Sequence, residues 1–166
     1  MLHNKTLGIV GLGHVGRHVA TLAGAFGMQV QSWSRNAPPA ALDALLESSD
    51  VVSIHATLSG QTRGLIDARR LALMKPTAYL VNTARGAIVD EAALVSALRE
   101  GRIAGAGLDV FAEEPLPAGH PLTQLPNVVL TPHLGWPTDE AYERFADAAA
   151  DVILAWLDGQ DVPRFE

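Results

Sequence analysis

The sequence has no cysteine, no long apolar run and few basic residues, and each absence excludes a class of function. Without cysteine the chain can form neither disulfides nor thiolate metal sites, and we expect no metal. The segment Met1–Lys5 leads into a strand of four or five residues before glycines intervene, so neither a secretory leader nor a membrane span fits. Twelve Lys and Arg stand against eighteen Asp and Glu, and the net charge of −6 argues against a nucleic-acid surface. We expect a cytoplasmic protein that binds neither nucleic acid nor membrane.

The 166 residues, of which 48% are hydrophobic and 18% charged, are typical of one soluble α/β domain spanning residues 1–166. Apolar runs alternate with helical patterns, which indicates βαβ units around a parallel sheet. The pattern predicts strands at 7–10, 28–33, 50–54, 78–81, 104–108 and 128–130. It predicts helices at 14–26, 40–47, 67–74, 90–101 and 138–157. Right-handed crossovers then give a doubly wound sheet in the order 3-2-1-4-5-6 between two helical layers, with a long carboxyl-terminal helix.

A glycine motif, Gly-Leu-Gly-His-Val-Gly, lies between the first predicted strand and the first predicted helix. Gly11 permits a tight turn, Gly13 lets the backbone approach a pyrophosphate, and Gly16 allows the helix and strand to pack closely. The free N–H groups and the dipole of the helix then face the phosphates. A structural turn without a ligand is the alternative, but the strand–turn–helix context favours the dinucleotide site of a Rossmann fold.

The end of the second predicted strand carries Ser34 and Arg35, where NAD-binding folds place an Asp or Glu that binds the adenosine ribose. A hydroxyl and a guanidinium suit a 2′-phosphate, which a carboxylate would repel. The sequence therefore favours NADP over NAD. The alternative is that Arg35 is a solvated loop residue.

Four charged residues follow the carboxyl ends of three strands, the edge where open α/β sheets bind ligands. Arg85 follows the fourth strand, Asp109 and Glu114 follow the fifth, and His133 follows the sixth. Hydride delivery to a ketone needs a proton donor, for which a histidine is suited, and a carboxylate beside it would orient the ring. Glu114 is the expected carboxylate, with Glu113 as the alternative. An arginine can bind a substrate carboxylate through two hydrogen bonds. Ordinary loop or turn roles remain the alternative for all of them.

The segments 82–86, Asn-Thr-Ala-Arg-Gly, and 131–133, Thr-Pro-His, resemble the D-isomer-specific 2-hydroxyacid dehydrogenases, and the likeness extends over almost the whole chain. The resemblance implies that Arg85 binds substrate, that His133 is the acid/base and that Glu114 is its partner. It implies pyrophosphate contacts from the main chain of His14 and Val15. The implied cofactor-binding set is Gly11, Gly13, His14, Val15, Gly16, Ser34, Arg35, Thr83, Ala84, Arg85, Asp109, His133 and Gly135, with Thr83, Ala84 and Asp109 along the nicotinamide.

Trp33-Ser34-Arg35 resembles the NADP-preferring glyoxylate and hydroxypyruvate reductases of that family. The resemblance also implies a second, amino-terminal substrate domain of roughly 100 residues, which we expect to be absent here. Two functions remain open. One is hydride transfer between NAD(P) and a small 2-hydroxy or 2-oxo acid. The other is a truncated, catalytically silent module that binds nucleotide and forms a homodimer through the last helix and Trp136.

Overall fold

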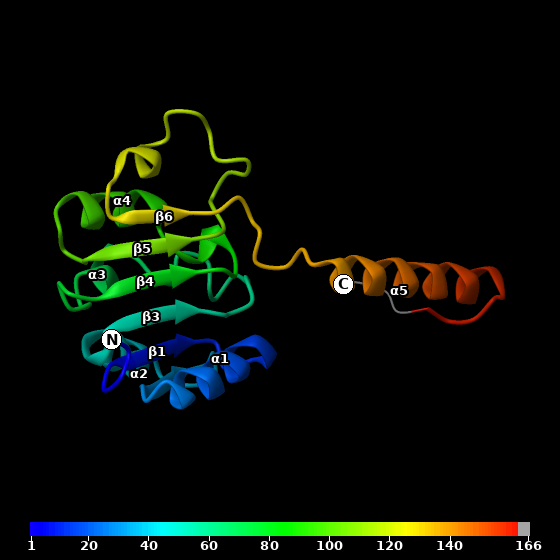
Figure 1. Cartoon of the computed structure of the whole chain (residues 1–166), viewed down its shortest axis with the longest axis horizontal. Helices are drawn as coiled ribbons and strands as arrows, with labels where there is room; N and C mark the ends of the chain where they lie inside the picture. The colour runs from blue at the N-terminus through cyan, green and yellow to red at the C-terminus, as the bar shows by residue number, and fades with distance from the viewer. Residues whose placement is uncertain (163–166) are drawn as a thin grey trace. The chain divides into compact units, whose positions relative to one another are not determined.

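A six-stranded parallel sheet forms the centre of the first 133 residues in the computed structural model, which describes residues 1–162 (Figure 1). A second compact unit begins at Leu134. The strands are β1 (Thr6–Val10), β2 (Gln29–Trp33), β3 (Val51–Ile54), β4 (Tyr79–Asn82), β5 (Gly105–Leu108) and β6 (Val128–Leu130). All six agree with the predicted strands to within one residue at each end.

The strand order is β2-β1-β3-β4-β5-β6, so the predicted order 3-2-1-4-5-6 is wrong. The third strand pairs with β1 on the side away from β2, and Ile9 lies opposite Ser53 in that register. Burial explains the arrangement. Val52 and Ile54 of β3 are fully buried, whereas only Trp33 of β2 is buried. An apolar strand belongs in the interior of a parallel sheet, and a polar one such as β2 is tolerated at its edge.

Helices cover both faces of the sheet, as predicted for a doubly wound fold (Figure 1). On one face, Ala23 of α1 (His14–Ala25) packs in a small cluster with Leu7 and Ile9 of β1. The larger core lies on the other face, under α2 (Pro39–Ser48), α3 (Ala68–Leu71) and α4 (Glu91–Arg99). The helix predicted at 67–74 is shorter than expected, because α3 is a single turn of four residues. Two short 3-10 turns, η1 (Gly86–Ile88) and η2 (Pro121–Gln124), follow β4 and β5.

The described part of the second unit, residues 134–162, contains one helix, α5 (Asp139–Leu157). Thr138 caps it by accepting a hydrogen bond from the Ala141 N–H, and no residue of the helix is buried. Trp136 packs against Tyr142 and Phe145, with ring centroids 5.4 and 5.7 Å apart. That this unit and the sheet form one domain stays a prediction. Among residues 1–162 there is no helix of the length and apolarity needed to cross a membrane.

Asp50 fastens the amino ends of β1 and β3 to each other. Its carboxylate accepts a hydrogen bond from the Thr6 N–H at 2.8 Å, and the Lys75 and Lys5 ammonium groups lie 3.3 and 3.9 Å away. The Thr6 N–H, followed by the Lys75 and Lys5 charges, lowers the pKa of Asp50 below its usual value. A carboxylate whose pKa is lower in the folded than in the unfolded chain stabilises the fold while it is ionised.

We predict that Asp50→Asn lowers the free energy of unfolding by about 1–1.5 kcal/mol at neutral pH, because a charged acceptor becomes a neutral one. The contribution is present above the unfolded pKa of about 3.9 and is lost as the pH falls through the lower folded value. Urea unfolding across this range should therefore show the variant and the parent converging in acid. Glu47→Gln, at an exposed position on α2, is the control. A deficit that is the same at every pH would contradict this role for the charge.

Candidate active site and cofactor site

Two glycines of the turn after β1, Gly11 and Gly16, leave no room for a side chain. Gly11 has φ +102°, and a Cβ there would lie 2.5 Å from the Ala56 nitrogen and 2.7 Å from the His55 carbonyl carbon. A Cβ on Gly16 would lie 2.3 Å from the Gly11 carbonyl oxygen. The turn is therefore pressed against the end of β3 on one side and against the first turn of α1 on the other.

Gly13 has the opposite surroundings, since a Cβ there would meet nothing within 4 Å. It is the N-cap of α1, so no side chain caps the free N–H groups of the first turn, and that turn contains no acidic residue. His14 and Val15, the first two helical residues, are exposed. Open space in front of uncapped amides and a positive helix end fits the diphosphate of a dinucleotide.

Ser34 and Arg35 lie beside this turn. The Gly11 N–H donates a hydrogen bond to the Trp33 carbonyl at 2.8 Å, which ties the end of β2 to the glycine turn. Both residues are exposed, and the Ser34 carbonyl accepts a hydrogen bond from the Ala37 N–H at 2.8 Å. Within residues 1–162 no carboxylate forms an ion pair with Arg35, so its guanidinium is available to an anion.

Asn82, which sequence reasoning assigned no role, shapes the turn that carries Arg85. It is buried at the end of β4, where its amide donates to the Arg85 carbonyl at 3.0 Å and its Oδ1 accepts from the Ala84 N–H at 3.1 Å. Thr83 and Arg85 are exposed at the carboxyl edge as a result. A Cβ on Gly86 would lie 2.0 Å from the Phe111 carbonyl, so this turn packs tightly on the loop after β5. The signal that could have identified Asn82 is that a polar residue ends an otherwise apolar strand.

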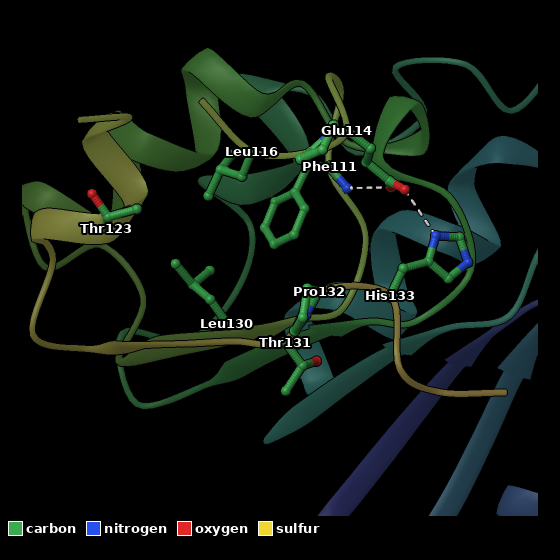
Figure 2. A pocket seen from close by; sticks show the side chains of 9 residues that line it. Phe111, Glu114, Leu116, Thr123, Leu130, Thr131, Pro132 and His133 are labelled. Atoms are coloured by element: carbon green, nitrogen blue, oxygen red, sulfur yellow. Dashed lines mark hydrogen bonds and ion pairs between the residues drawn. The ribbon is translucent and has the colours of Figure 1, made fainter. Parts of the chain in front are cut away.

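His133 and Glu114 form the predicted pair (Figure 2). The ring Nδ1 and the carboxylate Oε2 are 2.8 Å apart, and Oε1 accepts a hydrogen bond from the Phe111 N–H at 2.9 Å. The hydrogen bond from His133 and that from Phe111 lower the pKa of Glu114, and the positive charge of Arg85 adds to the effect. Glu114 is thus an anion that holds Nδ1, and within residues 1–162 no side chain or backbone group bonds to Nε2. Glu114, rather than Glu113, is the carboxylate at the ring.

The backbone brings His133 to this position. Its N–H donates to the Asp109 carbonyl at 2.9 Å, and its φ of +56° lies in the left-handed region, which non-glycine residues adopt rarely. Asp109 is buried, and its carboxylate accepts a hydrogen bond from the Thr131 hydroxyl. Sequence reasoning missed Thr131. The signal that could have found it is its position: Thr131 is the first residue after β6, and Asp109 is the first residue after the neighbouring strand β5.

A cavity of about 620 Å³ opens beside the His133–Glu114 pair. Figure 2 shows the pair at one end and Thr123 of η2 at the other, with apolar side chains between them. The lining residues are Phe111, Glu114, Pro115, Leu116, Thr123, Leu130, Thr131, Pro132 and His133. Apolar side chains thus border the pair on one side, while about a third of each of its two side chains is exposed to solvent. Gly135 belongs to the second unit, and its assigned cofactor contact stays a prediction.

Residues 1–135 match the family model described as D-isomer specific 2-hydroxyacid dehydrogenase, NAD binding domain. A glyoxylate reductase of Thermofilum pendens is 48% identical over 173 residues, which cover 98% of this chain and 51% of that protein. One of Aeropyrum pernix is 49% identical over 172 residues, again 98% of this chain and 51% of the relative. The chain spans about half the length of the curated relatives it matches.

Solved structures show the same fold. The TT0316 protein from Thermus thermophilus has a TM-score of 0.91 at 48% identity, with 98% of this chain and 54% of that chain covered. A D-isomer specific 2-hydroxyacid dehydrogenase from Xanthobacter autotrophicus, in complex with NADPH and MES, has a TM-score of 0.82 at 38% identity, with 95% and 69% covered. One from Lactobacillus delbrueckii ssp. bulgaricus, in its NAD-complexed form, has a TM-score of 0.85 at 33% identity, with 99% and 56% covered.

Proposed function

The chain belongs to the D-isomer specific 2-hydroxyacid dehydrogenase family, and on that premise we propose that it serves hydride transfer between a nicotinamide dinucleotide and a small 2-hydroxy or 2-oxo acid. The substrate class proposed is that of glyoxylate and hydroxypyruvate, after the named relatives. The observation that carries the proposal is the His133–Glu114 pair, 2.8 Å apart, on the same edge of the sheet as the glycine turn. We also propose a cytoplasmic location.

Each side chain has a role in this proposal. The bound nicotinamide supplies or accepts the hydride at the carbon that carries the substrate oxygen. His133 donates a proton from Nε2 to the substrate oxygen as the 2-oxo acid is reduced, and takes one back in the reverse direction. Glu114 holds Nδ1 and stabilises the protonated ring, for which its lowered pKa keeps it ionised. Arg85 binds the substrate carboxylate through its guanidinium.

A second function has its own support. This function is that of a module that binds nucleotide without turnover. Such a module would keep the His133–Glu114 pair and the glycine turn but would not close a cleft over the substrate. The exposed apolar residues of α5 favour this alternative, because they suit a dimerisation role.

We predict very low turnover of glyoxylate and hydroxypyruvate by the 166-residue chain, measured as NADPH oxidation, although the cofactor binds. Positioning of reactants can supply about 7–11 kcal/mol of rate enhancement, and an open cleft forgoes most of it. The residual rate should fall at least about tenfold further in His133→Asn, since an acid/base contributes about 10²–10⁴-fold. His3→Asn, before β1, is the control. Turnover at the level of the family's enzymes would rule out the silent module. A residual rate that is the same in His133→Asn as in the parent would contradict the proposed mechanism.

We propose that the cofactor is NADP(H) in preference to NAD(H). The exposed position of Arg35 beside the Gly11 turn supports this. Arg35→Ala should weaken NADPH binding by about 1–3 kcal/mol, as loss of a charged hydrogen bond would, and leave NADH binding almost unchanged. Calorimetric titration of both cofactors measures the difference, with Arg99→Ala on α4 as the control. Equal weakening of the two cofactors by Arg35→Ala would refute the assignment.

We propose that the chain forms a homodimer through α5 and the segment around Trp136. Seven large apolar or aromatic side chains of this helix are exposed: Tyr142, Phe145, Val152, Ile153, Leu154, Trp156 and Leu157. An apolar surface of this kind usually has a partner, and two-fold dimers are the commonest assembly. Sedimentation at micromolar concentration should show a dimer that Ile153→Asp dissociates and that Asp151→Asn does not. A single species at 17.6 kDa would rule the dimer out.

A further inference from the structure

His55, a residue that the proposed reaction leaves without a role, lies between the two halves of the site. β3 separates β1 from β4 in the sheet, so the end of β3 stands between the glycine turn and the turn that carries Arg85. His55 is the first residue after β3, and its N–H donates to the Val10 carbonyl at 2.8 Å. Its own carbonyl carbon is one of the atoms that a Cβ on Gly11 would meet. A dinucleotide that runs from the glycine turn to Arg85 therefore crosses His55.

The imidazole of His55 is held in one orientation by Ser53. Ser53 is buried, and its hydroxyl is 2.8 Å from the ring Nε2. Ser53 lies opposite Ile9 in the sheet, and Ile9 packs on the face that α1 covers. Alternation along the strand places His55 on the same face as Ser53, one step nearer the carboxyl edge. The ring is thus directed to the face of the sheet from which the glycine turn leads into α1.

The second ring nitrogen of His55, Nδ1, has no hydrogen-bond partner among residues 1–162. The residue is half-buried, and burial lowers the pKa of its imidazole. At neutral pH the ring is therefore uncharged, with one nitrogen that donates a hydrogen bond and one that accepts. Such a ring suits a neutral partner rather than a salt bridge.

We propose that His55, oriented by Ser53, binds the nicotinamide-side ribose of the dinucleotide through Nδ1. A sugar hydroxyl can both donate and accept, so it matches Nδ1 whichever nitrogen carries the proton. A diphosphate oxygen only accepts, and the uncapped amides of α1 already provide donors for it. The assignment rests on the proposed dinucleotide site, and it makes His55 a binding residue between the diphosphate and the reacting ring.

The test compares ligands that differ only beyond the diphosphate. ADP ends at the diphosphate, ADP-ribose adds the second ribose, and NADH adds the nicotinamide. His55→Ala should weaken ADP-ribose and NADH binding by the same factor, about three- to tenfold, which is the value of one hydrogen bond. ADP binding should not change. Ser53→Ala should act in the same direction and less strongly, and His3→Ala should leave all three affinities unchanged.

A second readout separates binding from a purely structural role. In ¹⁵N-labelled chain, the ring resonances of His55 should shift on addition of ADP-ribose and stay in place on addition of ADP. Equal loss of ADP and ADP-ribose affinity in His55→Ala would mean that the residue supports the Gly11 turn, and would overturn the proposal. Unchanged ADP-ribose affinity would overturn it too. If the parent chain binds none of the three ligands, the dinucleotide site itself fails, which is a distinguishable result.

Discussion

The close approach of three strand ends at Gly11 is the contact on which the rest of the site depends. The Gly11 N–H reaches the carbonyl that ends β2, while its Cα faces the backbone that follows β3 so closely that a Cβ would overlap it. This approach needs β1 between β2 and β3, which is the observed order. It fixes the start of α1 at the carboxyl edge, and with it the direction of the uncapped amides. Ser34, Arg35 and His55 adjoin the turn through the same contact.

The other half of the site is organised by loops that pack on one another. Asn82 shapes the Arg85 turn from below, and Gly86 lets that turn meet the Phe111 carbonyl. The loop after β5 also carries Glu114, whose two carboxylate oxygens are bound by the Phe111 N–H and by His133. A carboxylate with both oxygens engaged keeps a fixed orientation, which a proton-transferring imidazole requires of its partner. The backbone thus sets the geometry of the pair before any ligand binds.

Sequence patterns predicted the positions of the helices and strands along the chain better than they predicted which strands are neighbours in the sheet. The period of apolar residues located every strand, and the helices predicted at 90–101 and 138–157 start at the residues that the structure shows as N-caps, Asp90 and Thr138. The order of the strands was wrong because handedness alone does not say on which side of β1 the third strand pairs. The polarity of β2 and the apolar character of β3 carried that information. The pairing of Glu114 with His133 was predictable because their strand ends share an edge. The contact of Thr131 with Asp109 depends on strand register, which periodicity does not supply. The local contacts of Asn82 and His55 depend on how the chain turns after its strand, which periodicity does not supply either.

The most direct test of the account replaces Gly13 by alanine. At φ −79° and ψ −159° any residue can be accommodated, and the added methyl meets no protein atom within 4 Å. The melting temperature of the free chain should therefore stay close to that of the parent. The methyl would occupy the space in front of the first turn of α1, so calorimetric titration should show NADPH and NADH affinities reduced by at least about tenfold. Undiminished affinity for both cofactors would contradict the account, because the diphosphate would then bind elsewhere.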